Sequence, residues 1–121
     1  MKSKWIDHKG CRILYVDCSN YGSDSAALRE EARAIIALVT QQPENSVLAL
    51  SNALGTVGTP ENLNILKGIV TRTTRFVRRR AVVGVTGIRR TLLDIVNRAA
   101  GGKAFSAFTD ESSALDWLVT D

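Results

Sequence analysis

Apolar residues along this chain fall into two patterns, which alternate: short apolar runs and longer stretches with helical spacing. The short runs cover residues 11–17, 47–50 and 81–85, and two weaker ones cover 4–7 and 104–108. Runs rich in valine, with no polar alternation, are typical of strands that are covered on both faces. The runs therefore predict four main strands and a short first one.

Between these runs, apolar residues recur every three or four positions, which predicts helices. The first helix begins with Asp24 or Ser25 as its cap and ends near Gln41. Thr59, followed by Pro60 and an acid, starts the second helix, because proline and acids suit a first turn. Its apolar stripe extends to Val77, so the prediction places the arginines at 78–80 at its C-terminal end, where the helix dipole favours cations.

Two further helices are predicted in the second half of the chain. One covers residues 88–100 and ends at Gly101-Gly102. The last is capped by Thr109 or Asp110 and carries Ala114, Leu115 and Leu118 on one side. Strands that alternate with helices predict an α/β fold with a mainly parallel sheet, and 121 residues are enough for one domain over 1–121.

Ligands of parallel sheets usually bind beyond the carboxyl ends of the strands. In this chain the expected rim holds residues 17–19, then Ser51, Asn52 and Gly55, then Thr86 and Gly87. Gly84-Val85-Thr86-Gly87, followed by Arg89 and Arg90, could hold an anion at a helix N-terminus. The alternative is structural: the glycines allow a turn and close packing, and Thr86 caps the helix. The segment matches neither the dinucleotide fingerprint nor the P-loop.

Composition and cysteines narrow the setting. Hydrophobic residues make up 45% of the chain and charged residues 23%, as in ordinary globular domains. No apolar stretch approaches the ~20 residues of a spanning helix. The first seven residues reach an acid, Asp7, before any apolar run of the kind that a secretory signal contains. The expectation is therefore a cytoplasmic protein with no transmembrane segment. Cys11 and Cys18 are seven positions apart on one predicted strand and point to opposite faces, so both are expected to be reduced thiols.

Positive charge is concentrated in one part of the chain. Residues 60–103 hold ten basic and two acidic residues, a net charge of +8, whereas the whole chain carries +4. Such an excess suits either an anionic partner or a solvated face. No aromatic residues interleave with the arginines and no helix-turn-helix or RNP-like pattern is present, which argues against a nucleic-acid partner.

The residues offer little to catalysis. Cys18 and Ser19 lie where a nucleophile could, but the single histidine, His8, is expected at the opposite end of the strand. Asp17 alone would be a weak base at neutral pH. Histidine, cysteine and acidic residues form no ligand cluster at a recognisable spacing, so no metal or cofactor is expected. The sequence predicts a protein that is not an enzyme.

The order of elements resembles a family of small bacterial STAS-like (anti-sigma-factor-antagonist-like) proteins, which are related in fold to lipid-binding CRAL-TRIO domains. The resemblance rests on residues 10–17 (GCRILYVD), 81–87 (AVVGVTG) and 114–119 (ALDWLV). It implies an antiparallel first strand, supplied here by residues 4–7, and helices mainly on one face. Regulatory relatives carry a phosphorylated serine after the second parallel strand; this chain lacks their Asp-Ser pair there, and Ser51 or Thr56 would be a remote substitute.

The expected function is therefore that of a STAS-like regulatory module, which acts through a protein partner or by forming a homo-oligomer. The alternative is a carrier or sensor of a small anionic or lipid-like ligand. For the alternative, the expected site is the rim, with Ser51, Asn52, Gly55, Thr86, Gly87, Arg89 and Arg90 as candidate residues.

Overall fold

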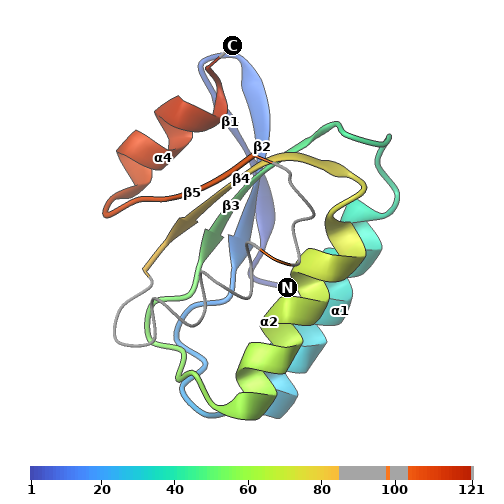
Figure 1. Ribbon diagram of the computed structural model, residues 1–121, viewed down its shortest axis with the longest axis vertical. Coiled ribbons are helices and arrows are strands. Elements are labelled where there is room, and N and C mark those ends of the chain that lie inside the picture. The colour runs from blue at the N-terminus through green and yellow to red at the C-terminus, as the bar shows by residue number, and fades with distance from the viewer. Residues whose placement is uncertain (85–97, 99–103, 121) are drawn as a thin grey trace.

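The computed structural model describes residues 1–84, 98 and 104–120. These residues form one five-stranded sheet with helices on both sides (Figure 1). In chain order the elements are β1 (Lys4–His8), β2 (Cys11–Asp17), α1 (Ser25–Val39), β3 (Val47–Asn52), α2 (Pro60–Thr73), β4 (Val77–Val83), β5 (Ala104–Ala107) and α4 (Glu111–Leu118).

The strands lie in the sheet in the same order as in the chain. β1 pairs antiparallel with β2, and β2 to β5 pair in parallel. This confirms an α/β fold with a mainly parallel sheet and an antiparallel first strand. The described residues contain three helices where the sequence predicted about four; the helix expected over 88–100 lies outside the described residues apart from Arg98.

Helices cover the two faces of the sheet differently. α1 and α2 lie together on one face, and α4 lies on the other, against β3 and β4 (Figure 1). Right-handed crossovers between neighbouring parallel strands place their helices on the same face, which explains the α1/α2 layer. Each face has its own apolar core, with residues such as Leu14, Val16 and Ile35 on the α1/α2 side and Ile13, Leu50 and Leu118 on the α4 side.

All three helix starts in the described residues lie where the sequence predicted them, with Asp110 as the cap of α4. The side chain of Asp24 accepts a hydrogen bond from Ala27 N (3.1 Å), and Thr59 Oγ1 accepts one from Asn62 N (3.1 Å). Pro60 occupies the first turn of α2, where its missing N–H costs nothing. These starts are predictable because a cap is a local interaction between residues three positions apart.

The junction of α2 and β4 corrects the sequence prediction. α2 ends at Thr73, and β4 already begins at Val77, so Arg78, Arg79 and Arg80 lie in a strand and not at a helix C-terminus. The apolar stripe that suggested a longer helix belongs to two elements, because Val77 packs into the α1/α2 core from the sheet. Pairing of β4 with the buried strand β3 outweighs local helical spacing here.

β3 is also longer than predicted. It continues to Asn52, so Ser51 and Asn52 are strand residues with fixed side-chain directions and not part of a loop. Among the described residues, no helix has both the length and the apolar character needed to cross a membrane.

Candidate functional site

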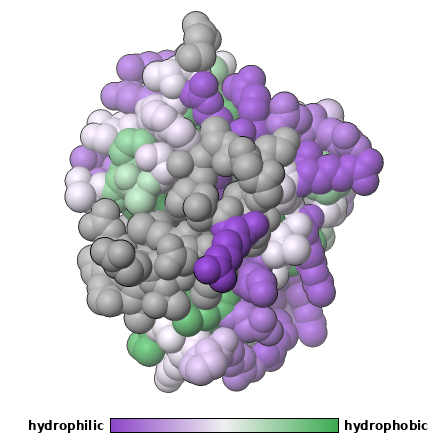
Figure 2. Space-filling view, viewed as in Figure 1, coloured by the Kyte–Doolittle hydropathy of each residue, from purple (hydrophilic) through white to green (hydrophobic). Residues whose placement is uncertain are grey.

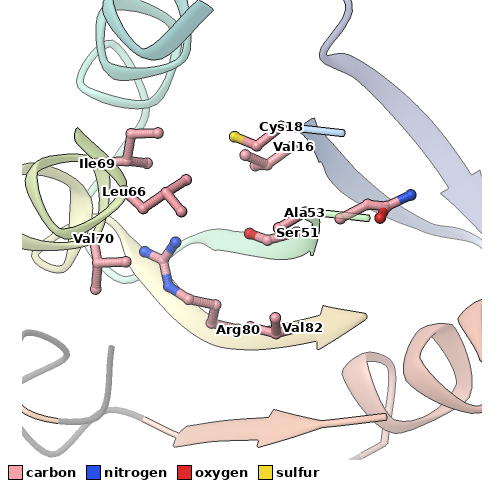
Figure 3. Close-up of a pocket in the computed structure, with 10 residues that line it drawn as sticks. Val16, Cys18, Ser51, Ala53, Leu66, Ile69, Val70, Arg80 and Val82 are labelled. Carbon is pink, nitrogen blue, oxygen red and sulfur yellow. The ribbon is translucent and has the colours of Figure 1, made fainter. Parts of the chain in front are cut away.

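A small cavity lies between the sheet and α2, near the carboxyl ends of β2, β3 and β4 (Figure 3). Its volume is about 40 Å³. Seven of its described lining residues are apolar or weakly polar, and three are polar: Val16, Cys18, Ala53, Leu66, Ile69, Val70 and Val82, with Ser51, Asn52 and Arg80. We call this cavity the Arg80 pocket, because Arg80 is the only charged side chain among these residues.

Arg80 enters the pocket from β4, and its guanidinium points toward α2 (Figure 3). The residue is only 4% exposed. Its Nη2 donates a hydrogen bond to Thr73 Oγ1 (2.9 Å), and that hydroxyl in turn donates to the carbonyl of Ile69 (2.6 Å). Thr73 therefore accepts a hydrogen bond from one of the five N–H groups of the guanidinium. No other described residue accepts a hydrogen bond from this guanidinium.

A local irregularity in the sheet decides which arginine enters this face. Val47 pairs with Val77, but the next residue, Leu48, pairs with Arg79, so the register shifts by one residue. Without that shift the side chains of Arg79 and Arg80 would exchange faces, because alternate strand residues point to opposite sides. With it, Arg80 pairs with Ala49 and shares the α1/α2 face.

Arg79 consequently lies on the other face, where it has acceptors. Its Nη1 donates to the carbonyl of Trp117 (3.0 Å) and to Thr120 Oγ1 (2.6 Å) at the C-terminal end of α4. That end of a helix carries partial negative charge, so the cation is well placed. Arg79 thus finds two hydrogen-bond acceptors among the described residues, whereas Arg80 on the same strand finds one.

The charge of Arg80 has no acidic partner in the part of the chain that the structure describes. None of the ion pairs among those residues includes it. Burial lowers the pKa of Arg80 to about 10, which still leaves the side chain charged at neutral pH. Buried charges in proteins are normally paired, because desolvation of an ion is costly. Among the described residues, therefore, no acidic side chain compensates the positive charge that Arg80 brings to these mostly apolar walls.

Cys18 does not supply the missing negative charge. Its side chain lines the same pocket and is buried, and burial, with a smaller contribution from Glu31, raises the pKa of the thiol to about 12. At neutral pH the sulfur carries its proton and no charge. Cys18 is therefore a neutral wall of the pocket.

Ser51 is the predicted rim residue that lies best for binding. It lies on the neighbouring strand two residues beyond Ala49, the residue that pairs with Arg80, and its hydroxyl points into the pocket (Figure 3). No described residue forms a hydrogen bond with that hydroxyl. Ser51 and Arg80 thus present two hydrogen-bond donors to one small space.

The other predicted rim residues are placed differently. Asn52 also lines the pocket, but its side chain binds elsewhere, through Nδ2 to Tyr15 Oη (3.0 Å) and through Oδ1 to Leu54 N (2.9 Å). Gly55 packs against Asn20 in the adjoining loop and does not line the pocket. Thr86, Gly87, Arg89 and Arg90 lie outside the described residues.

The loops next to the pocket are held together by hydrogen bonds. Thr56 Oγ1 binds the carbonyl of Cys18, and Thr56 forms an isolated bridge with Gly22. Asn62, which is fully buried, donates from Nδ2 to the carbonyls of Gly22 (3.2 Å) and Val57 (2.8 Å). These bonds join the β2–α1 loop to the β3–α2 loop, which fixes the two loops relative to each other.

A second, more open hollow of about 390 Å³ lies at the rim on the α4 side. Asp110 and Glu111 are among its lining residues, and Glu111 accepts a hydrogen bond from Tyr15 Oη (2.6 Å). Two acidic side chains would repel an anion there. Of these two places in the described part of the rim, the Arg80 pocket is the one with the right charge for an anion.

Cys18 and Ser19, the residues considered for nucleophilic catalysis, lie apart from the histidine. His8 binds Asp116 (Nε2 to Oδ1, 2.8 Å) and not Cys18 or Ser19. Burial would raise the pKa of Asp17, but hydrogen bonds from Ser19 outweigh it and lower that pKa, so the carboxylate is a poor proton acceptor. Both cysteines are free thiols, as the sequence predicted. Within the described ranges no three His, Cys, Asp or Glu side chains gather as metal ligands would.

Sequence reasoning missed Arg80 as a site residue, because the arginine run was assigned to a helix end. A signal was present, because Arg80 directly precedes the buried run from Ala81 to Val83. If the strand is extended by one residue, Arg80 becomes part of it and can face a core.

A scan against protein-family models finds none that matches this chain, and a search of curated proteins finds no significant match.

Proposed function

We propose that this chain is a non-enzymatic binding module with a STAS-like fold, and that it carries or senses a small anionic ligand in the Arg80 pocket. One observation carries the proposal: Arg80, which is 4% exposed, lines a mostly apolar cavity, and its guanidinium finds only a hydroxyl as an acceptor among the described residues. An anion would supply the missing charge and accept the remaining N–H groups.

Two further observations support this function. The five-stranded sheet with an antiparallel first strand is the arrangement that the STAS-like resemblance implies. The raised pKa of Cys18 and the distant pairing of His8 with Asp116 favour binding over nucleophilic chemistry. The proposed setting is the cytoplasm of a bacterium, in keeping with two free thiols.

Native mass spectrometry of protein purified from its own host tests this function. The expected result is a bound species of defined mass on the wild-type chain that is lost from Arg80→Met, which removes the charge and leaves an unbranched apolar side chain. Arg78→Met is the matched control, since Arg78 is an exposed neighbour in the same strand. A bound species that persists in Arg80→Met, or no bound species together with no thermal shift from any anion, would reject the proposal.

A second candidate function is regulation through a protein partner or a second copy of the chain. Leu54 and Val57 are each 54% exposed and lie in the loop between β3 and α2. Hydrophobic surface shows at the lower edge of Figure 2, whereas hydrophilic residues cover the side where α1 and α2 lie. Light scattering of the wild type and of a Leu54→Ser, Val57→Ser variant tests it: a dimer that the double variant dissociates supports self-association.

A further inference from the structure

The Arg80 pocket differs from a general anion site in having one cation and apolar walls. Its other described lining residues carry no charge, and its two further polar side chains are Ser51 and Asn52. Asn52 is already hydrogen-bonded to Tyr15 and Leu54. The available recognition groups are therefore one guanidinium and one hydroxyl.

We infer that the ligand is a monocarboxylate with a short apolar stem; this rests on the proposed function. A carboxylate has one negative charge, which matches one guanidinium, and its two oxygens fit the planar fork of N–H groups. With Nη2 bound to Thr73, the Nε and Nη1 groups find no acceptor among the described residues. Ser51 adds a donor from the neighbouring strand.

The walls select against inorganic oxyanions. Phosphate or sulfate would direct oxygens in four directions, and several would face Val16, Leu66 or Val70 without a donor. A dianion would also be left with an excess negative charge beside a single cation. A carboxylate instead keeps its oxygens on one side and presents carbon to the apolar walls.

The size of the cavity limits what is enclosed. A water molecule needs about 10–15 Å³ of such volume, so 40 Å³ accommodates a carboxylate and its first carbon or two. A longer stem would contact apolar lining residues such as Ala53 and Leu66. Acetate, propionate and butyrate should therefore bind with increasing affinity, by up to about fourfold for each buried CH₂.

Titration of the intact chain with butyrate, followed by NMR chemical shifts, tests the inference. Butyramide is the matched ligand because it has the same shape without the charge, and phosphate is the competing oxyanion. We expect butyrate to bind at least tenfold more tightly than either. Arg80→Met should abolish butyrate binding, Ser51→Val should weaken it by filling the pocket with the charge intact, and Arg78→Met should leave it unchanged.

The outcomes separate this inference from the proposed function. Binding of phosphate in an Arg80-dependent way, with none of butyrate, would overturn the carboxylate class and leave an anion-binding module. No Arg80-dependent binding of either would overturn both. Asp94 is the only acidic residue in 85–103; if Asp94→Asn created butyrate binding that the wild type lacks, the chain itself would supply the counter-charge and the inference would fail.

Discussion

Glu31 and Arg80 are the two buried charged residues among those the structure describes, and the chain treats them in opposite ways. Glu31, on α1, is 6% exposed and accepts hydrogen bonds from the backbone N–H groups of Lys2 (3.0 Å) and Ser3 (2.8 Å). Arg80, on β4, is 4% exposed and donates to the hydroxyl of Thr73. One charge is satisfied by the fold, and the other faces a cavity.

The difference shows which buried charge the described residues satisfy fully and which they satisfy only in part. The segment before β1 lies against Glu31 and supplies donors at a fixed geometry, so nothing further is needed there. Around Arg80 the neighbouring strand and helix contribute side chains with no negative charge. Structural and binding roles can thus be told apart by how completely each buried charge is satisfied.

The pKa of Cys18 depends on both of these charges. Slow alkylation of its thiol is the largest effect that we predict. Burial, and then the charge of Glu31, raise its pKa to about 12, whereas Arg80 acts to lower it. At pH 8 its thiolate fraction should be about a thousandfold below that of a free thiol. In a Cys11→Ser background, iodoacetamide should therefore react about a thousandfold more slowly with the native chain than with the chain in urea. A ratio below tenfold would contradict the burial of Cys18.

Glu31→Ala should lower the free energy of unfolding by about 2–3 kcal/mol, because two hydrogen bonds to a charged acceptor are lost. Urea unfolding followed by circular dichroism measures this. Glu30→Ala is the matched control, since Glu30 lies on the exposed side of the same helix. Equal effects of the two substitutions would show that the bonds from Lys2 and Ser3 contribute nothing.

Arg80→Met should raise the free energy of unfolding of the ligand-free protein by about 1–2 kcal/mol, the opposite sign to Glu31→Ala. An unbranched apolar side chain removes a charge that no described acidic residue compensates, and it packs against the same walls. Arg78→Met should change stability by less than about 0.5 kcal/mol. A loss of stability in Arg80→Met would mean that the charge is compensated within the chain.

The smallest effect is a change in the pH dependence of stability. Burial would raise the pKa of Glu31, but hydrogen bonds from Lys2 and Ser3 outweigh it and lower that pKa below its ordinary value of 4.5. Such a group stabilises the fold above its unfolded pKa, and this contribution is lost as the pH falls through the folded pKa. Glu31→Gln should therefore show a shallower fall in stability below about pH 4.5. Unchanged slopes would contradict the lowered pKa.

Part of the candidate site could be predicted from the sequence. Ser51 was expected at the rim because the carboxyl end of a buried strand is an interpretable position, and it does line the pocket. Gly55 was expected there because it belongs to the loop that follows the same strand, but it packs against Asn20. The difference arises because strand position fixes a direction for a side chain, whereas loop composition does not.

The sequence by itself determined the features that depend on near neighbours. The caps Asp24 and Thr59, the strand from Cys11 to Asp17 and the α/β class all follow from interactions over a few positions or from periodicity. Each of these patterns lies within a single helix or strand, so it can be interpreted without knowing which strands pair with one another.

Only the tertiary structure decided where β4 begins and which arginine is buried. Both depend on the pairing of β4 with β3, in which a one-residue shift after Val47 places Arg80 with Ala49 on the α1/α2 face and Arg79 on the α4 face. The three arginines at 78–80 are identical in type and adjacent in sequence. Their environments differ because side-chain direction alternates along a strand, and the register that sets this alternation comes from a partner some thirty residues away.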